Sequence, residues 1–220
     1  MIKVAIVDDH QLFRKSLALL LSTFDELEIV FDTDDGLEFL KYASNEEVDV
    51  LLLDIQMPII DGYEVCKRLH SINPKIKILI LSQLTSKEAI HKVMECGANG
   101  FFTKNSSPEL LESAIKKVVE QDYYFDIELG AVIREAILWE KKVQYNGDLS
   151  IQLTLSSREI EIIKLACVEM SSKEMGDKLC ISQRTVEKHK NRMMEKTKAK
   201  NFLGVVLYAL KINAIRLDEL

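Results

Sequence analysis

The chain has 220 residues, of which 47% are hydrophobic and 29% are charged, a balance typical of a soluble globular protein and not of a disordered or fibrous one. The length suits one ordinary domain and a smaller one. No stretch approaches the roughly 18 uninterrupted apolar residues of a membrane-spanning helix, and no export signal is evident. The four scattered cysteines lack the spacing of a disulfide framework or a zinc site, so we expect reduced thiols in the cytoplasm.

The net charge of -6 is unevenly distributed along the chain. Residues 1–125 carry 13 basic and 21 acidic side chains, whereas residues 151–220 carry 13 basic and 9 acidic ones. Between 182 and 200 there are seven basic residues against two acidic ones. A basic segment attracts nucleic acid, although a charge run can also be a solvated helix face. The charge division therefore predicts two parts with different partners.

The first 125 residues alternate short aliphatic runs with amphipathic stretches. Strands are predicted at 2–9, 28–31, 48–54, 77–82 and 100–104, and helices at 12–21, 37–43, 63–69, 89–96 and 110–119. The strand runs are continuously apolar, as in parallel strands that are buried on both faces. Ser107-Pro108-Glu109 is a helix-start pattern, and Gly97 suits a helix end. Five such units in series predict an α/β fold, a doubly wound five-stranded parallel sheet.

Polar residues with distinctive chemistry stand at the ends of these strands. The first strand ends in Asp8-Asp9, the third in Asp54, the fourth in Ser82 and the fifth in Lys104. The carboxyl ends of parallel strands form one edge of the sheet, where ligands bind. Three carboxylates repel one another there unless a cation lies among them, and oxygen ligands favour Mg²⁺. A carboxylate beside Mg²⁺ is placed to form an acyl phosphate, with Lys104 and Ser82 holding the phosphoryl oxygens.

Four segments of this part carry a family resemblance: VDDH (7–10), LLLDIQMPIIDGYEV (51–65), LILSQ (79–83) and GANGFFTK (97–104). They resemble the receiver domain of two-component response regulators. The resemblance implies a flavodoxin-like sheet and transfer of a phosphoryl group from a sensor histidine kinase to Asp54.

The same resemblance implies a role for each residue of the acidic edge. Mg²⁺ would be held by Asp8, Asp9, Asp54 and the backbone carbonyl of Gln56, while Ser82 and Lys104 would bind the phosphoryl group and Phe101 would be the switch aromatic. Two residues depart from the family pattern: Asn105 follows Lys104 where many receivers carry a proline, and Gln83 is larger than the residue usually found after Ser82. The first change is discounted, because the subfamily suspected for this chain often lacks that proline. The change at Gln83 bears on the rate of phosphotransfer and on the lifetime of the phosphate.

Beyond residue 125 the pattern is helical only. Residues 127–142 predict a linker helix, and the polar segment 143–152 predicts a hinge. Ser156-x-x-Glu159 and Ser171-x-x-Glu174 have the capping-box form and would start helices near 157 and 172. Two further helices are predicted after Ser182 and Asn201, reaching about Thr197 and Ile212. The short interval 179–182 predicts the turn of a helix-turn-helix.

Segments 155–165, 171–182 and 184–201 closely resemble the LuxR-type helix-turn-helix of the NarL/FixJ subfamily. The resemblance implies that the helix after Ser182 enters the major groove of duplex DNA. It implies base contacts from Glu187, Lys188 and Asn191, and DNA-backbone contacts from Lys173, Arg184, Thr185, His189 and Lys190. The alternative for His189 is a histidine that packs inside the domain. Gly176 stands where alanine is usual, and we expect this glycine to cost up to about 1 kcal/mol of stability.

Both resemblances together predict a DNA-binding transcriptional response regulator and not an enzyme. We expect a receiver domain at 1–125, a helical linker and hinge at 126–150, and a DNA-binding domain at 151–220. The implied partners are the kinase, duplex DNA, RNA polymerase and, after phosphorylation, a second copy of the chain, with no membrane partner. The apolar residues Val205, Val206, Ala209 and Leu210 either fill a small core or also form the dimer contact.

Two other classes of protein share some of these features. An aspartyl-phosphate hydrolase of the haloacid dehalogenase type also has an α/β fold and an aspartate nucleophile. Those enzymes have a DxDxT pattern after the first strand, whereas this chain has DDHQ there, and Gln56 supplies no general acid two residues after Asp54. The second alternative is a receiver whose helical tail binds protein, and the basic third helix argues against it.

Overall fold

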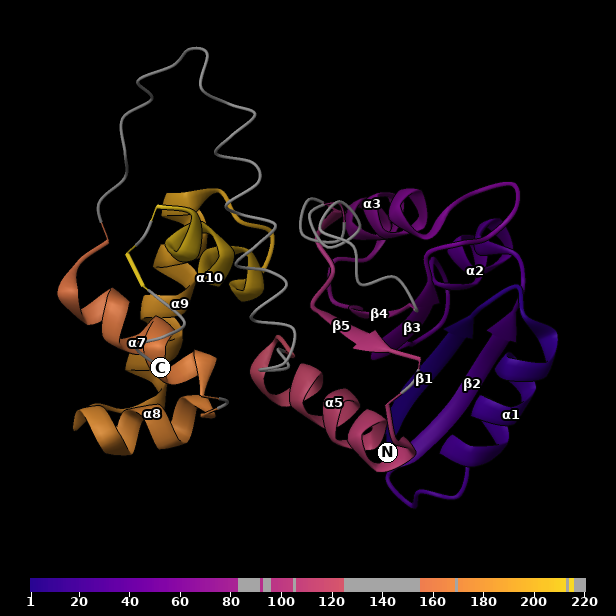
Figure 1. Ribbon diagram of the computed structural model, residues 1–220, viewed down its shortest axis with the longest axis horizontal. Coiled ribbons are helices and arrows are strands. Elements are labelled where there is room, and N and C mark those ends of the chain that lie inside the picture. The colour runs from indigo at the N-terminus through magenta and orange to yellow at the C-terminus, as the bar shows by residue number, and fades with distance from the viewer. Residues whose placement is uncertain are drawn as a thin grey trace, which may run out of the picture. The chain divides into compact units, whose positions relative to one another are not determined.

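The computed structural model describes residues 1–82, 92, 96–104, 106–124, 155–168, 170–212 and 214–215. The chain divides into two compact units, seen in the described residues as 1–82 with 96–124, and as 155–215 (Figure 1). The predicted linker helix and hinge, Gln83 and most of the predicted helix at 89–96 lie outside the described residues. Among the described helices, none combines the length and the apolar character that crossing a membrane requires.

The first unit is built on a five-stranded parallel sheet with the strand order β2-β1-β3-β4-β5. Its strands are β1 (Ile2–Val7), β2 (Leu27–Thr33), β3 (Val50–Asp54), β4 (Lys77–Ser82) and β5 (Gly100–Thr103). The strand order reverses direction between β1 and β3, so the carboxyl ends of these two strands form the switch point where ligands bind in such sheets. The predicted fold class is confirmed.

Helices cover both faces of this sheet (Figure 1). The first unit contains α1 (Gln11–Leu21), α2 (Gly36–Tyr42), α3 (Gly62–Ile72) and α5 (Pro108–Gln121). Buried residues of α1 and α5 pack with alternate strand residues such as Ile6, Leu52 and Leu81. Successive strand residues point to opposite faces, so the equally buried Leu51 and Leu53 face the side of α2 and α3. Continuously apolar strands are what two covered faces require.

Helix starts in the first unit follow the polar residues of the sequence, with one difference in detail. Asp61 caps α3 by accepting a hydrogen bond from the backbone N–H of Glu64. Ser107 is the N-cap of α5, as predicted, but its hydroxyl makes no capping bond to the backbone. The Glu109 carboxylate accepts from its own backbone N–H and from the Ser107 hydroxyl instead, and both bonds lower the pKa of Glu109.

The described regular secondary structure from 155 onward is all helical. The second unit contains α7 (Ser157–Cys167), α8 (Ser172–Leu179), α9 (Gln183–Thr197) and α10 (Phe202–Lys211). Both predicted capping boxes are present, each with reciprocal bonds between the serine and the glutamate three residues later. Val205, Val206, Ala209 and Leu210 are all buried, which favours the core-filling interpretation of this face. A dimer contact through it stays a prediction.

α8 lies unusually close to the turn that follows it, and the contact is at Gly176. The backbone N–H of Ile181 donates to the Gly176 carbonyl at 2.9 Å. A Cβ atom added to Gly176 would lie only 2.7 Å from the Ile181 carbonyl oxygen and 3.2 Å from the Gln183 nitrogen. The expectation that glycine is unfavourable here is therefore wrong, because the close approach of the two backbone segments leaves no space for a methyl group.

We predict that Gly176→Ala lowers the stability of the second unit. An extra methyl group in a filled site costs roughly 1–3 kcal/mol, which exceeds the gain of up to about 1 kcal/mol in helix propensity. Thermal unfolding of the full chain measures the change in melting temperature. Asp177→Ala, at the exposed next position, is the matched control and should change it little. A Gly176→Ala protein as stable as the wild type would contradict the prediction.

Candidate functional site

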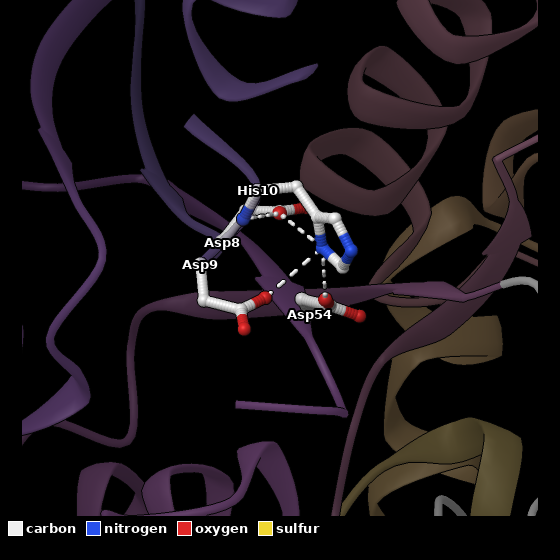
Figure 2. A group of neighbouring side chains, drawn as sticks. All are labelled: Asp8, Asp9, His10 and Asp54. Atoms are coloured by element: carbon white, nitrogen blue, oxygen red, sulfur yellow. Dashed lines mark hydrogen bonds and ion pairs between the residues drawn. The ribbon is translucent and has the colours of Figure 1, made fainter. Parts of the chain in front are cut away.

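Three aspartates from two strand ends meet at the carboxyl edge of the sheet. Asp8 and Asp9 follow β1, and Asp54 is the last residue of β3. The Asp8 and Asp54 side chains are buried, whereas that of Asp9 is partly exposed. One ligand atom from each aspartate and one from His10 all lie within 4.8 Å of one another. Figure 2 shows the His10 ring directed at all three carboxylates.

The ammonium of Lys104 lies between two of these carboxylates. Its Nζ atom is 2.7 Å from Asp8 Oδ2 and 3.0 Å from Asp54 Oδ2, and the lysine side chain is only 7% exposed. The ammonium also lies 4.8 Å from the centre of the Phe13 ring, a favourable cation–π distance. The backbone N–H of Lys104 donates to the Ser82 carbonyl, which holds the end of β5 level with the end of β4. The lysine thus offsets part of the repulsion between Asp8 and Asp54.

Asp54 carries its charge in an unfavourable environment. Burial raises the pKa of its carboxyl, the Lys104 ammonium opposes this rise, and the Asp8 carboxylate adds to it. Oδ1 of Asp54 accepts a hydrogen bond from the backbone N–H of Ile55 at 2.8 Å. Because the folded-state pKa is raised, stability is lost as the pH increases through that pKa and the carboxylate forms. A bound cation would relieve this cost.

The donor set fits a hard divalent cation. Asp9 Oδ1 is buried and accepts no hydrogen bond from any described residue. It lies 3.0 Å from His10 Nδ1, a contact that is an ion pair only when the imidazole is protonated. Apart from His10, the possible metal ligands of this cluster are carboxylate oxygens, which Mg²⁺ prefers. Gln56 is exposed, and its backbone N–H donates to Asp54.

The loop after Asp54 folds back onto the same strand end. The backbone N–H of Gly62 donates to the Ile55 carbonyl at 3.0 Å, and a Cβ atom on Gly62 would lie 2.2 Å from the Asp54 carbonyl oxygen. Within this loop Ile59 has a φ of 71° and is 86% exposed. A left-handed conformation is strained for a β-branched residue. The Asp61-Gly62 pattern signals a turn, but no local pattern signals the strain at Ile59.

Arg14, which no sequence motif indicated, supports the acidic loop from within α1. Its Nη1 donates to the backbone carbonyl of Asp8. Its Nε and Nη2 atoms lie 3.9 Å from carboxylate oxygens of Asp32 and Asp34, respectively, at the end of β2. Arg14 is buried on the same helix face as Leu17 and Leu21. A charged residue in an apolar helical stripe is the signal that could have identified it.

The two other predicted residues of this edge are buried on neighbouring strands. Ser82 ends β4 and pairs with Thr103 of β5, while Asp54 pairs with the preceding residue of β4, Leu81. Phe101 lies on β5 beside Ile80 and is 4% exposed. Ser82 thus stands one residue beyond the level of Asp54.

A second group of predicted residues lies on α9 and α8. Arg184, Glu187, Lys188 and Asn191 are exposed on α9, Lys173 is exposed on α8, and Thr185 and His189 are partly buried. Ser182 caps α9 by accepting from the backbone N–H of Thr185 at 3.1 Å. Most of the residues predicted to contact DNA are therefore exposed and can reach a duplex.

Lys190 is buried, unlike the other charged residues predicted to contact DNA. Its side chain is 6% exposed, its Nζ donates to Ser172 Oγ at 3.1 Å, and it lies 4.9 Å from the centre of the Phe202 ring. Lys190 thereby joins α8, α9 and α10, and it would have to leave this position to reach a phosphate. Position 190 follows the buried Val186 by one helical turn, so the helical spacing placed it on the inner face despite its charge.

We predict that Lys104→Met lowers the melting temperature of the full chain in the absence of divalent metal. Removing one partner of a buried ion pair typically costs about 3–5 kcal/mol, because the other charge is left uncompensated. Added Mg²⁺ should raise the melting temperature more in this variant than in the wild type, since the ion replaces the lost positive charge.

Lys15→Met is the matched control for this change. Lys15 forms an exposed ion pair with Asp32, and such pairs contribute little to stability. This variant should show a wild-type melting temperature and a wild-type response to Mg²⁺. Equal Mg²⁺ responses in Lys104→Met and the wild type would count against cation binding beside Lys104.

Two protein families match the sequence. Residues 4–116 match the response regulator receiver domain, and residues 153–209 match the bacterial regulatory proteins of the luxR family. The chain is 32% identical to the oxygen regulatory protein NreC of Staphylococcus carnosus (strain TM300) over 210 residues, which cover 95% of this chain and 97% of that protein. It is also 32% identical to NreC of Staphylococcus aureus (strain MRSA252) over 211 residues, with the same two coverages.

One similar solved structure is that of RcsB from Salmonella enterica serovar Typhimurium, described as bound to promoter P1flhDC in the presence of the phosphomimetic BeF3-. The match covers 96% of this chain and 98% of that chain with a TM-score of 0.57. The sequences are 20% identical, so this likeness supports the fold alone.

Proposed function

This chain belongs to the two-component response regulators that join a receiver domain to a LuxR-type DNA-binding domain, and on that premise we propose that phosphorylation of Asp54 controls its binding to DNA. The observation that carries the proposal is the buried cluster of Asp8, Asp54 and Lys104 at the switch point of the sheet. Its relatives are regulatory proteins, so the chain is not an aspartyl-phosphate hydrolase.

We assign the two functions to separate parts of the chain. The proposed receiver domain spans 1–125, the linker and hinge span 126–150, and the DNA-binding domain spans 151–220. The division of the described residues into two compact units, one ending at 124 and the other seen from 155 on, supports this separation into two domains. A regulator that meets both a histidine kinase and chromosomal DNA works in the cytoplasm.

The proposed reaction is a phosphoryl transfer between two side chains. A carboxylate oxygen of Asp54 attacks the phosphorus of a phosphohistidine on the sensor kinase, the P–N bond breaks, and the histidine leaves with its electron pair. Lys104 and Ser82 would bind the phosphoryl oxygens. Asp8, Asp9, Asp54 and the Gln56 carbonyl would hold Mg²⁺, which when bound supplies positive charge to those oxygens.

We predict that acetyl phosphate with Mg²⁺ adds one phosphoryl group to the full chain. Asp54→Ala should abolish the addition, because it removes the attacking oxygen. Intact-protein mass spectrometry measures the labelled fraction over time. Asp25→Ala, at an exposed position in a turn, is the control and should be labelled like the wild type. Full labelling of the Asp54→Ala protein would reject Asp54 as the acceptor.

We propose that α9 enters the major groove and that phosphorylation makes it available to DNA. Glu187, Lys188 and Asn191 would face bases, and Lys173, Arg184, Thr185 and His189 would face the DNA backbone. For Lys190, its buried position supports a role in holding α8 and α10 against α9. The exposure of the other charged residues and their positive net charge support this orientation.

The proposed signal passes from the acceptor to the surface of the receiver. A phosphoryl group on Asp54 would draw Ser82 toward it and leave space into which Phe101 can turn. The altered surface would favour a homodimer, and two half-sites read by one dimer bind more tightly than either alone. A regulator bound at a promoter has RNA polymerase as its further partner.

We predict that the phosphorylated full chain binds duplex DNA with an affinity that falls steeply as salt rises, because its basic residues displace counterions. Arg184→Ala should weaken binding to all sequences and reduce the slope of log K against log salt by about 1. Fluorescence anisotropy at several salt concentrations measures both quantities. Lys67→Ala, an exposed lysine of α3, is the control with an unchanged slope. Binding that is independent of salt, or absent, would favour a protein-binding tail.

A further inference from the structure

Glu187 is an acidic residue on a surface that is otherwise suited to a polyanion. The exposed side of α9 also carries Arg184, Lys188 and Arg192. DNA phosphates attract these three cations and repel a carboxylate. An acid in the middle of such a surface weakens binding to DNA of any sequence, unless it gains a specific contact in return. The donors available for such a contact in the major groove are the exocyclic amino groups of bases.

The Glu187 carboxylate is held in place by a residue of the same helix. The amide Nε2 of Gln183, one turn earlier, donates to Glu187 Oε1 at 2.8 Å. A carboxylate offers about four acceptor positions on its two oxygens, and this bond uses one of them. A side chain that is already oriented loses less rotamer freedom when it meets its partner. Gln183 therefore presents the remaining acceptor positions of Glu187 in one orientation.

We propose that Glu187 reads a cytosine in each half-site and that Gln183 is its positioning residue. This inference rests on the proposed function above, in which α9 enters the major groove. Cytosine presents only its N4 amino donor there, which matches a group that accepts and cannot donate. Guanine presents two acceptors and thymine presents an acceptor and a methyl group, so both repel the carboxylate. Adenine presents a donor beside the N7 acceptor, which disfavours an anion.

The position of Asn191 adds a second base to the pattern. Asn191 is exposed one turn after Glu187 on the same face of α9. Its amide matches adenine, which offers a donor and an acceptor side by side. Four residues of helix span about 6 Å, and base pairs are stacked about 3.4 Å apart. The cytosine and an adenine read by Asn191 therefore lie within about two base pairs of each other in the half-site.

A selection experiment tests the assignment with the full chain. The protein, activated with beryllofluoride and Mg²⁺, selects from a library of randomised duplexes, and the bound duplexes are sequenced. One position in each half-site should be enriched in cytosine. Replacing that C·G pair by T·A in the selected duplex should weaken wild-type binding by about ten-fold or more, the usual effect of losing one good base contact. For Glu187→Ala, the same replacement should change the dissociation constant less than two-fold.

Two further variants separate base reading from general electrostatics. Gln183→Ala should lower the affinity for the C·G duplex and leave the affinity for the T·A duplex unchanged. The ratio of the two affinities should therefore fall, as expected of a positioning residue. Glu195→Ala removes another exposed acid two turns further along α9. It should keep the wild-type ratio of the affinities for the two duplexes. Melting temperatures of all variants confirm that each one is folded.

The outcomes distinguish this inference from the proposed function. If Glu187→Ala binds all duplexes more tightly and keeps the cytosine preference, the carboxylate only repels phosphates and the inference is overturned. The inference is also overturned if the sequence selected by the wild type has no cytosine whose preference is lost in Glu187→Ala. In that case DNA binding itself still stands. If the wild type binds no duplex at all, the proposed function itself fails.

Discussion

Lys104 holds its ammonium 2.7 Å from Asp8 and 3.0 Å from Asp54 in a pocket that is almost closed to water. Without this cation, two buried carboxylates would face each other at the edge of an apolar sheet, a cost of several kcal/mol per ion. The lysine reaches them because β5 pairs in register with β4, which places the end of β5 level with Ser82. The apolar strands and the charged pocket therefore depend on each other.

A single lysine cannot fully compensate the carboxylates that it contacts. One ammonium is shared by two acids, so burial still raises the pKa of Asp54 despite its partner. A buried oxygen of Asp9 accepts no hydrogen bond within the described chain, and Arg14 ties the loop through a carbonyl and not through a carboxylate. Lys104 alone thus compensates the carboxylates only in part, which supports the proposed cation site beside them.

Local patterns predicted most of the fold and the members of the acidic edge. Continuous apolar runs mark strands that are covered on both faces, and Ser156 and Ser171 mark helix starts through contacts with residues three positions away. The strained φ of Ile59 and the missing space at Gly176 could not be predicted in this way. Both depend on how a loop or turn closes against another segment. The helical spacing from Val186 predicts that Lys190 is buried, whereas its charge suggested the exposed face.

The tight turn at Gly176 has a consequence for the entropy of recognition. Because Ile181 is bonded to α8 and Cys180 ends that helix in a left-handed conformation, α8 and α9 are held at one mutual angle before any partner arrives. Lys190 adds a tie from α9 to α8 and α10. In the proposed complex with DNA, residues on the two helices thus meet the duplex as one preformed template. The freedom that a looser pair of helices would lose on binding has already been lost on folding.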